Sequence, residues 1–323
     1  MQGFERGSER GSAHGYTKQP LIQMLRPENV GALANTAITW LKPPSYIAQP
    51  KRSIVPTPLS LGRIGSLEAR LAGNKHDIKQ AQRLRYKVFY KDGDAIADAR
   101  TLLARRDKDA YDRICDHLLV IDHDAEPTRS GKQRVVGTYR LLRQDIAEHH
   151  DGFYTENEFD ISGLTARHRD LRFVELGRSC VSPPYRNKRT VELLWQGIWS
   201  YVRQHHLDVM IGCASLNGTD PDRLALPLSF LHHFAAAPDS WRAGPQPSRR
   251  IEMNRIAKHR IDHKAVLREL PPLIKGYLRL GAYIGDGAVI DDQFGTTDVL
   301  IVLPMSAISD RYLNHFDQSR RAA

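Results

Sequence analysis

The sequence has few cysteines and no long apolar run. Cys115, Cys180 and Cys213 are the only cysteines among 323 residues, an odd number that cannot pair completely. They also lack the CxxC and Cys/His spacings of zinc sites. No apolar run is long enough to cross a bilayer, and the N-terminus MQGFERGSERGSAHGY lacks the apolar core of a secretory signal. We therefore expect a cytoplasmic protein with reduced thiols and no bound metal.

Acidic residues are in deficit. The chain holds 47 Lys and Arg against 37 Asp and Glu, a net charge of +10, which favours acidic partners such as nucleic acid, anionic lipid or an acidic carrier protein. Half of this excess lies in residues 1–65, which also hold seven of the 18 prolines. This composition predicts a basic, mostly flexible extension over residues 1–65, a folded domain over 66–316 and a short tail over 317–323.

One apolar stripe interrupts the extension. Its residues recur at the spacing of a helix face: Val30, Leu33, Ala34, Ala37, Ile38 and Leu41. Two interpretations stay open. The stripe packs on the folded domain, or it makes a peripheral contact with the inner face of the membrane. Its polar face consists of Asn and Thr rather than Lys, which favours the first interpretation.

Strand patterns alternate with helical patterns along the rest of the chain. Apolar runs predict strands over 117–121, 135–142, 172–180, 209–215 and 299–303. Helical spacing predicts helices over 77–90 and 191–202, the second with Thr190 as its N-cap. Together they indicate the α/β (α+β) class, a mixed sheet with helices on both faces.

The stretch VELGRSCVSPPYRNKR, residues 174–189, carries the strongest functional signal. In a strand over 172–180, Phe173, Glu175 and Gly177 lie on one face. A carboxylate among apolar residues has a raised pKa, which suits a general base. The alternative for Glu175 is a structural ion pair with Arg140 or Arg85.

The residues after Glu175 suggest how an oxyanion is held. Gly177 predicts a β-bulge, which leaves backbone N–H groups free of ladder pairing. We expect N–H groups near Gly177, Arg178 and Ser179 to stabilise a tetrahedral oxyanion.

Three cations follow directly, in the loop before the second helix. Arg186, Lys188 and Arg189 stand where a helix N-terminus offers free N–H groups, an arrangement that holds phosphate. The alternative is a solvated basic turn.

Three other patterns carry less weight. The HLLVID run matches an H-x4-D motif of glycerolipid acyltransferases, but in a strand His117 and Asp122 point to opposite faces. The paired histidines lack the spacing of metal ligands. A covalent acyl-enzyme on Cys180 would need an adjacent base, and no histidine is near it in sequence.

The order of strand, acid, bulge, basic loop and helix resembles the GCN5-related acyltransferase fold. There a pantetheine thioester inserts between two splayed strands. The glycine-rich loop Q/R-x-x-G-x-G/A of that fold is absent, and Arg186-Asn-Lys-Arg-Thr replaces it. The segment VELGRSCV is also similar to the Glu-x-x-Arg segment of acyl-homoserine-lactone synthases.

A longer resemblance is to ornithine–acyl carrier protein N-acyltransferases, which make lyso-ornithine lipid. It spans roughly Gln80 to Pro304 and is carried by AQRLRYKVFY, CDHLLV, VVGTYRLLR, GFYTENEFDI, ELGRSCV, IGCASLNGTDP, LPPLIKGYLRLGAYIGDGAVID and TTDVLIVLPM. The resemblance implies transfer of a 3-hydroxyacyl group from acyl carrier protein to the α-amine of ornithine. It implies no cofactor beyond the phosphopantetheine of the donor.

The residues themselves fit an amine acylation, with Glu175 removing a proton from the ammonium. Arg85, Asp112, Asp116 and Arg140 match charged positions of the lactone synthases, and we expect this group to hold the amino acid. Small residues over 212–215, including Cys213 and Ser215, would leave room for the acyl chain or pantetheine.

Two alternatives of different kinds stay open. One is a lactone synthase or another amino-acid N-acyltransferase. The other is a non-enzymatic basic protein that binds membrane or nucleic acid, although the sequence has no nucleic-acid recognition motif, so we expect no nucleic-acid partner.

Overall fold

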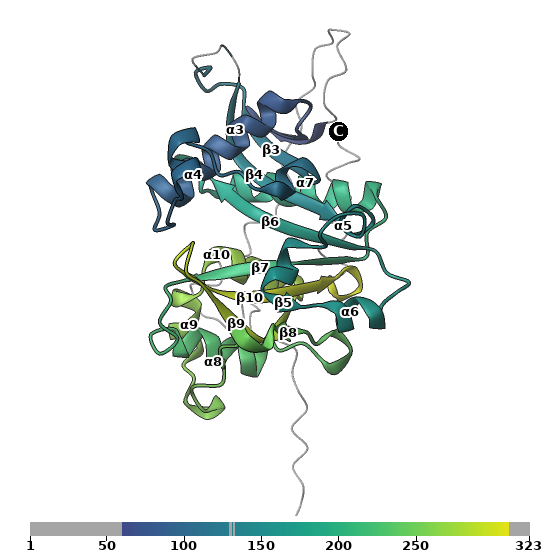
Figure 1. Ribbon diagram of the computed structural model, residues 1–323, viewed down its shortest axis with the longest axis vertical. Helices are drawn as coiled ribbons and strands as arrows, with labels where there is room; N and C mark the ends of the chain where they lie inside the picture. Colours follow the sequence, from purple (N-terminus) through teal and green to yellow (C-terminus); the bar gives the residue numbers. More distant parts are fainter. Residues whose placement is uncertain (1–59, 129–130, 132, 310–323) are drawn as a thin grey trace, which may run out of the picture.

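The computed structural model describes residues 60–128, 131 and 133–309. An eight-stranded sheet runs through them in the order β1-β2-β3-β4-β6-β7-β10-β9 (Figure 1). Its strands are β1 Ser60–Ile64, β2 Leu67–Leu71, β3 Asp116–Asp122, β4 Arg134–Arg143, β6 Phe173–Val181, β7 Val209–Asn217, β9 Tyr283–Asp291 and β10 Thr296–Pro304. A smaller pair joins β5 Phe159–Asp160 to β8 Gly244–Pro245.

The helices are distributed over both faces of the sheet, as predicted. They are α3 Lys75–Tyr86, α4 Ala99–Ala104, α5 Gln144–Ala147, α6 Ser162–Arg167, α7 Lys188–Gln204, α8 Ala225–Phe234, α9 His263–Glu269 and α10 Pro272–Leu280. A π-helical turn, Lys87–Lys91, continues α3, and a 3₁₀ turn, η5, covers Tyr154–Asn157. Within the described ranges, none of these helices has the length and apolarity needed to cross a bilayer.

The five predicted strands and both predicted helices are confirmed. Three strands of the eight-stranded sheet were missed, as were both strands of the smaller pair. β1 and β2 have five residues each, and few of their side chains are buried. Such short strands show little periodicity, so their pairing depends on contacts that sequence patterns do not reveal. β9 was missed although it is nine residues long, because it carries two internal glycines and two acids, which are poor strand formers.

The folded chain begins earlier than residue 66. β1 starts at Ser60, pairs with β2, and buries Leu61 to 7% exposure. The start at 66 is therefore corrected to Ser60. The apolar stripe between Val30 and Leu41 and the tail over 317–323 lie outside the described residues.

The two faces of the sheet carry different cores. Helix α7 packs across β1 to β4, and α8, α9 and α10 extend the same layer toward β9 and β10. Val174 and Leu176 of β6 point into this larger core. The opposite face carries α3 over β3 and β4 (Figure 1) and η5 beside β6. Phe173 and Ile211 lie in the core on that face. Glu175 shares the face of Phe173, as predicted.

The N-cap of helix α7 lies three residues before the predicted one. The Asn187 side chain accepts a hydrogen bond from the N–H of Thr190 at 3.2 Å, so Asn187 is the N-cap. Thr190 is fully buried inside the first turn. The prediction of Thr190 is therefore wrong, because asparagine caps at least as well as threonine and has the required extended backbone.

Strands β6 and β7 diverge shortly after they begin. They pair in parallel only from Phe173 to Glu175, opposite Val209 to Ile211, and then separate over the rest of their lengths (Figure 1). Gly212 sits at the point of separation, where a Cβ atom would lie 2.5 Å from the carbonyl oxygen of Leu176. Only glycine allows this close approach. The splayed pair implied by the resemblance is therefore present.

Candidate active site

Glu175 is the last residue of β6 that pairs with β7, so its side chain lies where the two strands part. It is 5% exposed. Its carboxylate is held by the start of η5. Oε2 accepts the Tyr154 N–H at 2.9 Å, and Oε1 accepts the Thr155 N–H at 2.6 Å together with the Thr155 hydroxyl. Burial raises the pKa of Glu175, and the hydrogen bonds from Thr155 and Tyr154 limit the rise.

The structure does not show the alternative ion pair for Glu175. Arg85 pairs with aspartates of the same chain, and Arg140 influences Glu175 only through its charge. A carboxylate offers about four acceptor positions, and three are used. One acceptor position on Oε2 is therefore available for a water molecule or an amine.

The predicted bulge is present, and it lies directly after Gly177. Thr138 of β4 faces Cys180, whereas Arg140 faces Gly177, so β6 contains one extra residue between them. Arg178 adopts the left-handed conformation at φ +50°, which is uncommon for a non-glycine residue and costs about 1–3 kcal/mol. The bulge turns the Arg178 side chain out of the regular alternation of β6.

Arg178 is fixed by aromatic and acidic neighbours. Its guanidinium carbon lies 4.7 Å from the ring centre of Tyr154 and 4.8 Å from that of Phe294. It approaches Asp107 and Asp109 at 3.4 Å each. Its buried Nε is the atom that lies 3.4 Å from Asp107 Oδ2, a charge contact without hydrogen-bond geometry. Asp107, Asp109 and the two aromatic rings therefore hold the Arg178 guanidinium beside the bulge.

Three arginines and three aspartates form one network on the face of Glu175. The arginines come from α3, β4 and β6, and the aspartates from the segment before β3; the members are Arg85, Arg140, Arg178, Asp107, Asp109 and Asp112. Opposite charges at 2.6–3.4 Å compensate one another in a buried setting. The network fixes the surface next to the bulge.

Arg85 and Asp112 are internal members of this network. The Arg85 side chain is 0% exposed and donates to Asp107 and Asp112 at 2.7 Å. It does not snorkel to solvent, and the anions that it binds belong to the protein. Asp112 also accepts from the side chain of Gln82 and the N–H of Asp109. Both residues support the site rather than face a substrate.

Arg140 is the arginine of this network whose charge acts on Glu175. It pairs with Asp109 at 2.6 Å, and its guanidinium carbon is 5.5 Å from the ring centres of Tyr111 and Tyr154. It also lies directly opposite Gly177 across the strands. The sheet thus brings Arg140, Gly177 and Glu175 together, as predicted.

The structure does not bring Asp116 to this group. Asp116 pairs with Leu141, which points into the core under α7, and accepts a hydrogen bond from the Tyr201 hydroxyl at 2.6 Å. Arg140 pairs with His117 and points to the other face. The two differ because neighbouring residues of a strand alternate between faces.

Ser179 also leaves the face of Glu175. Its side chain hydrogen-bonds to Tyr139, a residue of the larger core under α7. The bulge causes this change, because one extra residue shifts the alternation of β6. Only the backbone of Ser179 can contribute to the predicted oxyanion site.

Cys213 and Ser215 of β7 share the face of Glu175. Cys213 is partly exposed, and its Sγ lies 3.8 Å from the Thr155 hydroxyl that donates to Glu175. Ser215 is exposed, opposite Asp298 of β10. The predicted run of small residues therefore lines the side of β7 that faces the diverging β6.

Cys180 is poorly suited to act as a nucleophile. It is 3% exposed in the small core beneath α3, and burial raises the pKa of its thiol to about 12. A nucleophilic cysteine needs a stabilised thiolate. The geometry thus favours direct transfer over an acyl-enzyme on Cys180.

The three cations lie at the start of α7. Arg186 and Arg189 are exposed, while Lys188 is the partly buried first residue of the helix. The Nε of Arg186 donates to the carbonyl of Val181 at 3.1 Å, which ties this loop to the end of β6. All three cations follow β6, but only Arg186 lies in the loop before the helix as predicted. Lys188 and Arg189 belong to the first turn of α7, because the cap is Asn187.

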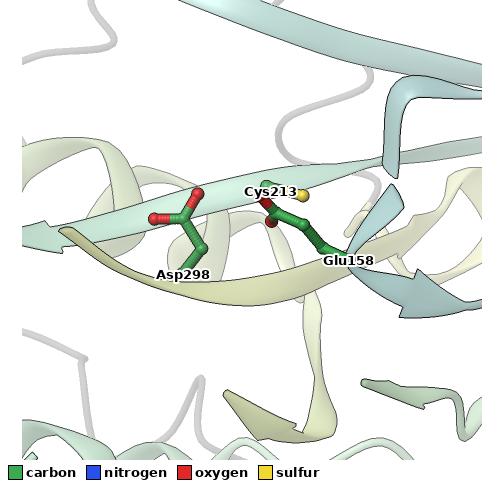
Figure 2. Close-up of side chains that lie close together, drawn as sticks. All are labelled: Glu158, Cys213 and Asp298. Carbon is green, nitrogen blue, oxygen red and sulfur yellow. The ribbon is translucent and has the colours of Figure 1, made fainter. Parts of the chain in front are cut away.

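Two acids near Cys213 were missed in the sequence. Glu158 follows η5 and Asp298 lies in β10; they are 4% and 6% exposed. Figure 2 shows the Glu158 carboxylate beside Cys213 and the Asp298 carboxylate on the other side of Glu158 from the sulfur; one oxygen of each acid and the sulfur lie within 4.8 Å of one another. Asp298 interrupts the apolar run TTDVLIVL just as Glu175 interrupts its strand, so the same signal was available.

Comparisons with known proteins identify the relatives of this chain. A model of the acetyltransferase (GNAT) domain matches residues 84–196, which include Glu175 and the bulge. L-ornithine N(alpha)-acyltransferase of Agrobacterium fabrum (strain C58) is 52% identical over 79% of this chain and 86% of that protein. Proteins of the same name from Rhizobium meliloti (strain 1021) and Rhodobacter capsulatus are 51% and 38% identical, over 82% and 76% of this chain and 90% and 93% of theirs.

Among solved structures, an N-acyl amino acid synthase from uncultured soil microbes superposes with a TM-score of 0.40 at 9% identity, over 74% of this chain and 91% of that chain. The sequence relatives are far more similar and cover most of both chains. On their identity and coverage, the chain belongs to the L-ornithine N(alpha)-acyltransferase family and has the GNAT fold.

Proposed function

We propose that this enzyme transfers an acyl group from acyl carrier protein to the α-amine of L-ornithine. The observation that carries the proposal is the buried Glu175 carboxylate at the point where β6 and β7 part. It occurs in a chain whose relatives at 51–52% identity bear the name of that acylation.

The chemistry needs a neutral amine next to a thioester. Glu175 accepts one proton from the ornithine α-ammonium, directly or through water, and the freed amine attacks the thioester carbonyl. The tetrahedral intermediate collapses, the C–S bond breaks, and an amide forms. The second proton of the amine passes to the departing pantetheine thiolate, so the products are N-acyl-ornithine and the carrier thiol.

The bulge supports the proposed intermediate. An extra residue in β6 interrupts ladder pairing, and N–H groups released in this way can donate to an oxyanion. The N–H groups from Gly177 to Ser179 lie two to four residues beyond Glu175 and therefore suit the role.

Arg178 and Arg140 suit the ornithine α-carboxylate. Both arginines lie beside Glu175, with Arg140 directly opposite Gly177 and Arg178 in the adjoining bulge. Charge-assisted bonds to a carboxylate are stronger than neutral ones. Two arginines on this side would orient the α-amine toward Glu175.

The loop before α7 favours a carrier protein as donor. Without a glycine-rich loop, a close backbone wrap around the pyrophosphate of coenzyme A is unfavourable. Acyl carrier protein offers one phosphodiester on an acidic surface, which complements the exposed Arg186 and Arg189. We further propose a 3-hydroxyacyl group as the cargo and a cytoplasmic location. A peripheral membrane contact of the apolar stripe between Val30 and Leu41 is the alternative to its packing on the folded domain.

The test is a donor comparison on purified enzyme. Thiol release is measured with 3-hydroxyacyl carrier protein or the matching acyl-CoA, with and without L-ornithine, at two ionic strengths. We expect release to require ornithine, to favour the carrier protein strongly and to weaken with salt. Ornithine-independent release would contradict the acceptor, and equal efficiency with acyl-CoA would contradict the donor.

A further inference from the structure

Glu158 and Asp298 are two buried acids that the proposed mechanism does not use. They approach one another beside Cys213 on the same face of the sheet as Glu175 (Figure 2). Two carboxylates out of water repel one another and cost free energy unless a cation compensates them.

No such compensation is visible within the described residues. Glu158 Oε2 is buried and has no hydrogen-bond partner. The two arginines whose charge reaches these acids are engaged elsewhere. Arg249 donates to the carbonyls of Asn157 and Ile290, and Arg178 pairs with Asp107 and Asp109. Asp298 accepts hydrogen bonds from the hydroxyls of Thr296 and Ser215, and Glu158 is hydrogen-bonded to the Cys213 thiol. None of these three groups carries a positive charge.

The acids are close to the proposed base and to the surface. Thr155 bonds Glu175 with its hydroxyl, and the same oxygen lies 3.8 Å from Cys213 Sγ. On the other side, Ser215 is exposed and pairs with Asp298 across the strands. The two acids therefore lie between the Glu175 site and the exposed Ser215 on one face of the sheet.

We infer that Glu158 and Asp298 bind the side-chain ammonium of the acceptor and select a diamino acid. The inference rests on the proposed function, since ornithine carries an ammonium at the end of its side chain. That group has three N–H donors and no acceptor, so one ammonium can serve both carboxylates. Arg178 and Arg140 then lie at the α-carboxylate end, and the acids at the side-chain end.

An uncharged acceptor of the same length leaves both acids buried and unpaired. Sites built around a polar group reject analogues that lack it by large factors, so we expect roughly 10³-fold or more against norvaline, which is ornithine without its terminal amine.

Glu158→Gln and Asp298→Asn test the inference in the full-length enzyme with acyl carrier protein as donor. We expect each to lower kcat/KM for ornithine by about 10²-fold, mainly through KM, while norvaline turnover stays equal or rises. Asp286→Asn, an exposed acid on β9, is the matched control and should behave like the wild type.

Several outcomes would overturn the inference. Equal losses on ornithine and norvaline would make the acids structural or assign Glu158 as the base. Unchanged ornithine kinetics would also reject it. A stoichiometric metal that is lost in Glu158→Gln would assign the acids to a metal. Calorimetry of wild-type enzyme without donor gives a second measurement, since ornithine must bind and norvaline must not.

The proposed function fails in a different way. Wild-type enzyme that does not acylate ornithine would overturn both claims. Wild-type enzyme that acylates ornithine and norvaline equally would overturn this inference alone.

Discussion

Glu175 and Glu158, two buried acids next to η5, differ in the hydrogen bonds that their carboxylates accept. Glu175 accepts two backbone N–H groups and a hydroxyl, whereas Glu158 has an oxygen without a partner. Hydrogen bonds favour a charged carboxylate and burial opposes it. The first residue is therefore held in position for proton transfer, and the second is left open to a cation.

Glu175→Gln should slow the chemical step by about 10²-fold or more, with little change in donor KM. The glutamine oxygen can still accept from Thr155, but its amide would face the Tyr154 N–H. The melting temperature is therefore recorded with single-turnover rates. Near-normal turnover would remove Glu175 from the mechanism.

Thr155→Val provides the companion variant. It removes the side-chain hydrogen bond that lowers the pKa of Glu175. The pKa should therefore rise, and the increase of rate with pH should occur at higher pH. An unchanged pH profile would contradict the assignment of the base.

Glu158 makes a prediction about stability and pH. Burial and the nearby Asp298 raise the pKa of Glu158 to about 7, and Asp291 adds to the rise while Cys213 and Arg249 oppose it. A carboxyl group whose pKa is higher in the folded chain than in the unfolded chain destabilises the folded chain as pH rises between the two pKa values, here from 4.5 to about 7. The free energy of unfolding should fall by roughly 3 kcal/mol across this window.

Glu158→Gln should remove most of this slope and be more stable than wild type at about pH 8, because no buried charge forms. Urea unfolding at several pH values measures it. A slope equal to that of the wild type would show that Glu158 is compensated in the folded protein.

At the scale of elements, the start of α7 connects the fold to the donor. Asn187 caps the helix, so Lys188 and Arg189 occupy its first turn rather than the preceding loop. The N–H of Thr190 is used by this cap. The positive charges of the exposed Arg186 and Arg189 are therefore the main groups at this end of α7 that attract an acidic carrier protein.

Charge reversal at Arg186 or at Arg189, in separate variants, should each raise KM for acyl carrier protein about tenfold and reduce the salt dependence, with less effect on kcat. Arg268→Glu, an exposed arginine on α9, is the control with the same change in charge. Equal effects from both sites would point to net charge alone, and no effect would place the carrier elsewhere.

Sequence patterns predicted elements wherever an apolar run was long and uninterrupted. The strand around Glu175 and the bulge after Gly177 could be read directly, because alternation and glycine are local signals. The separation of Asp116 from Arg140 depends on strand register. The meeting of Glu158 with Asp298, which is 140 positions later in the chain (298 − 158), depends on the pairing of β7 with β10. Local patterns carry no information of that kind.

For the whole molecule, the boundary at Ser60 changes an experiment. β1 is an edge strand of the sheet, and its Gly62 packs against the Gln196 side chain of α7, so closely that a Cβ atom would lie 2.6 Å from it. Deleting residues 1–59 should preserve turnover with acyl carrier protein. Deleting 1–65 also removes β1 and the buried Leu61, which should lower the melting temperature by several degrees.

Activity assays and thermal melts of both truncations measure this. Equal stability would show that β1 contributes little. Loss of turnover on deleting 1–59 would instead place those residues in the catalytic function, and liposome co-sedimentation would show whether they also bind lipid.

The central claim is that the enzyme acylates the α-amine of ornithine. The most direct test offers it 3-hydroxyacyl carrier protein with an equimolar mixture of ornithine, lysine, glycine and norvaline, and identifies products by fragment masses. The account predicts one dominant product, ornithine acylated on its α-nitrogen. A product acylated on the side-chain nitrogen, or comparable acylation of the other amino acids, would contradict it.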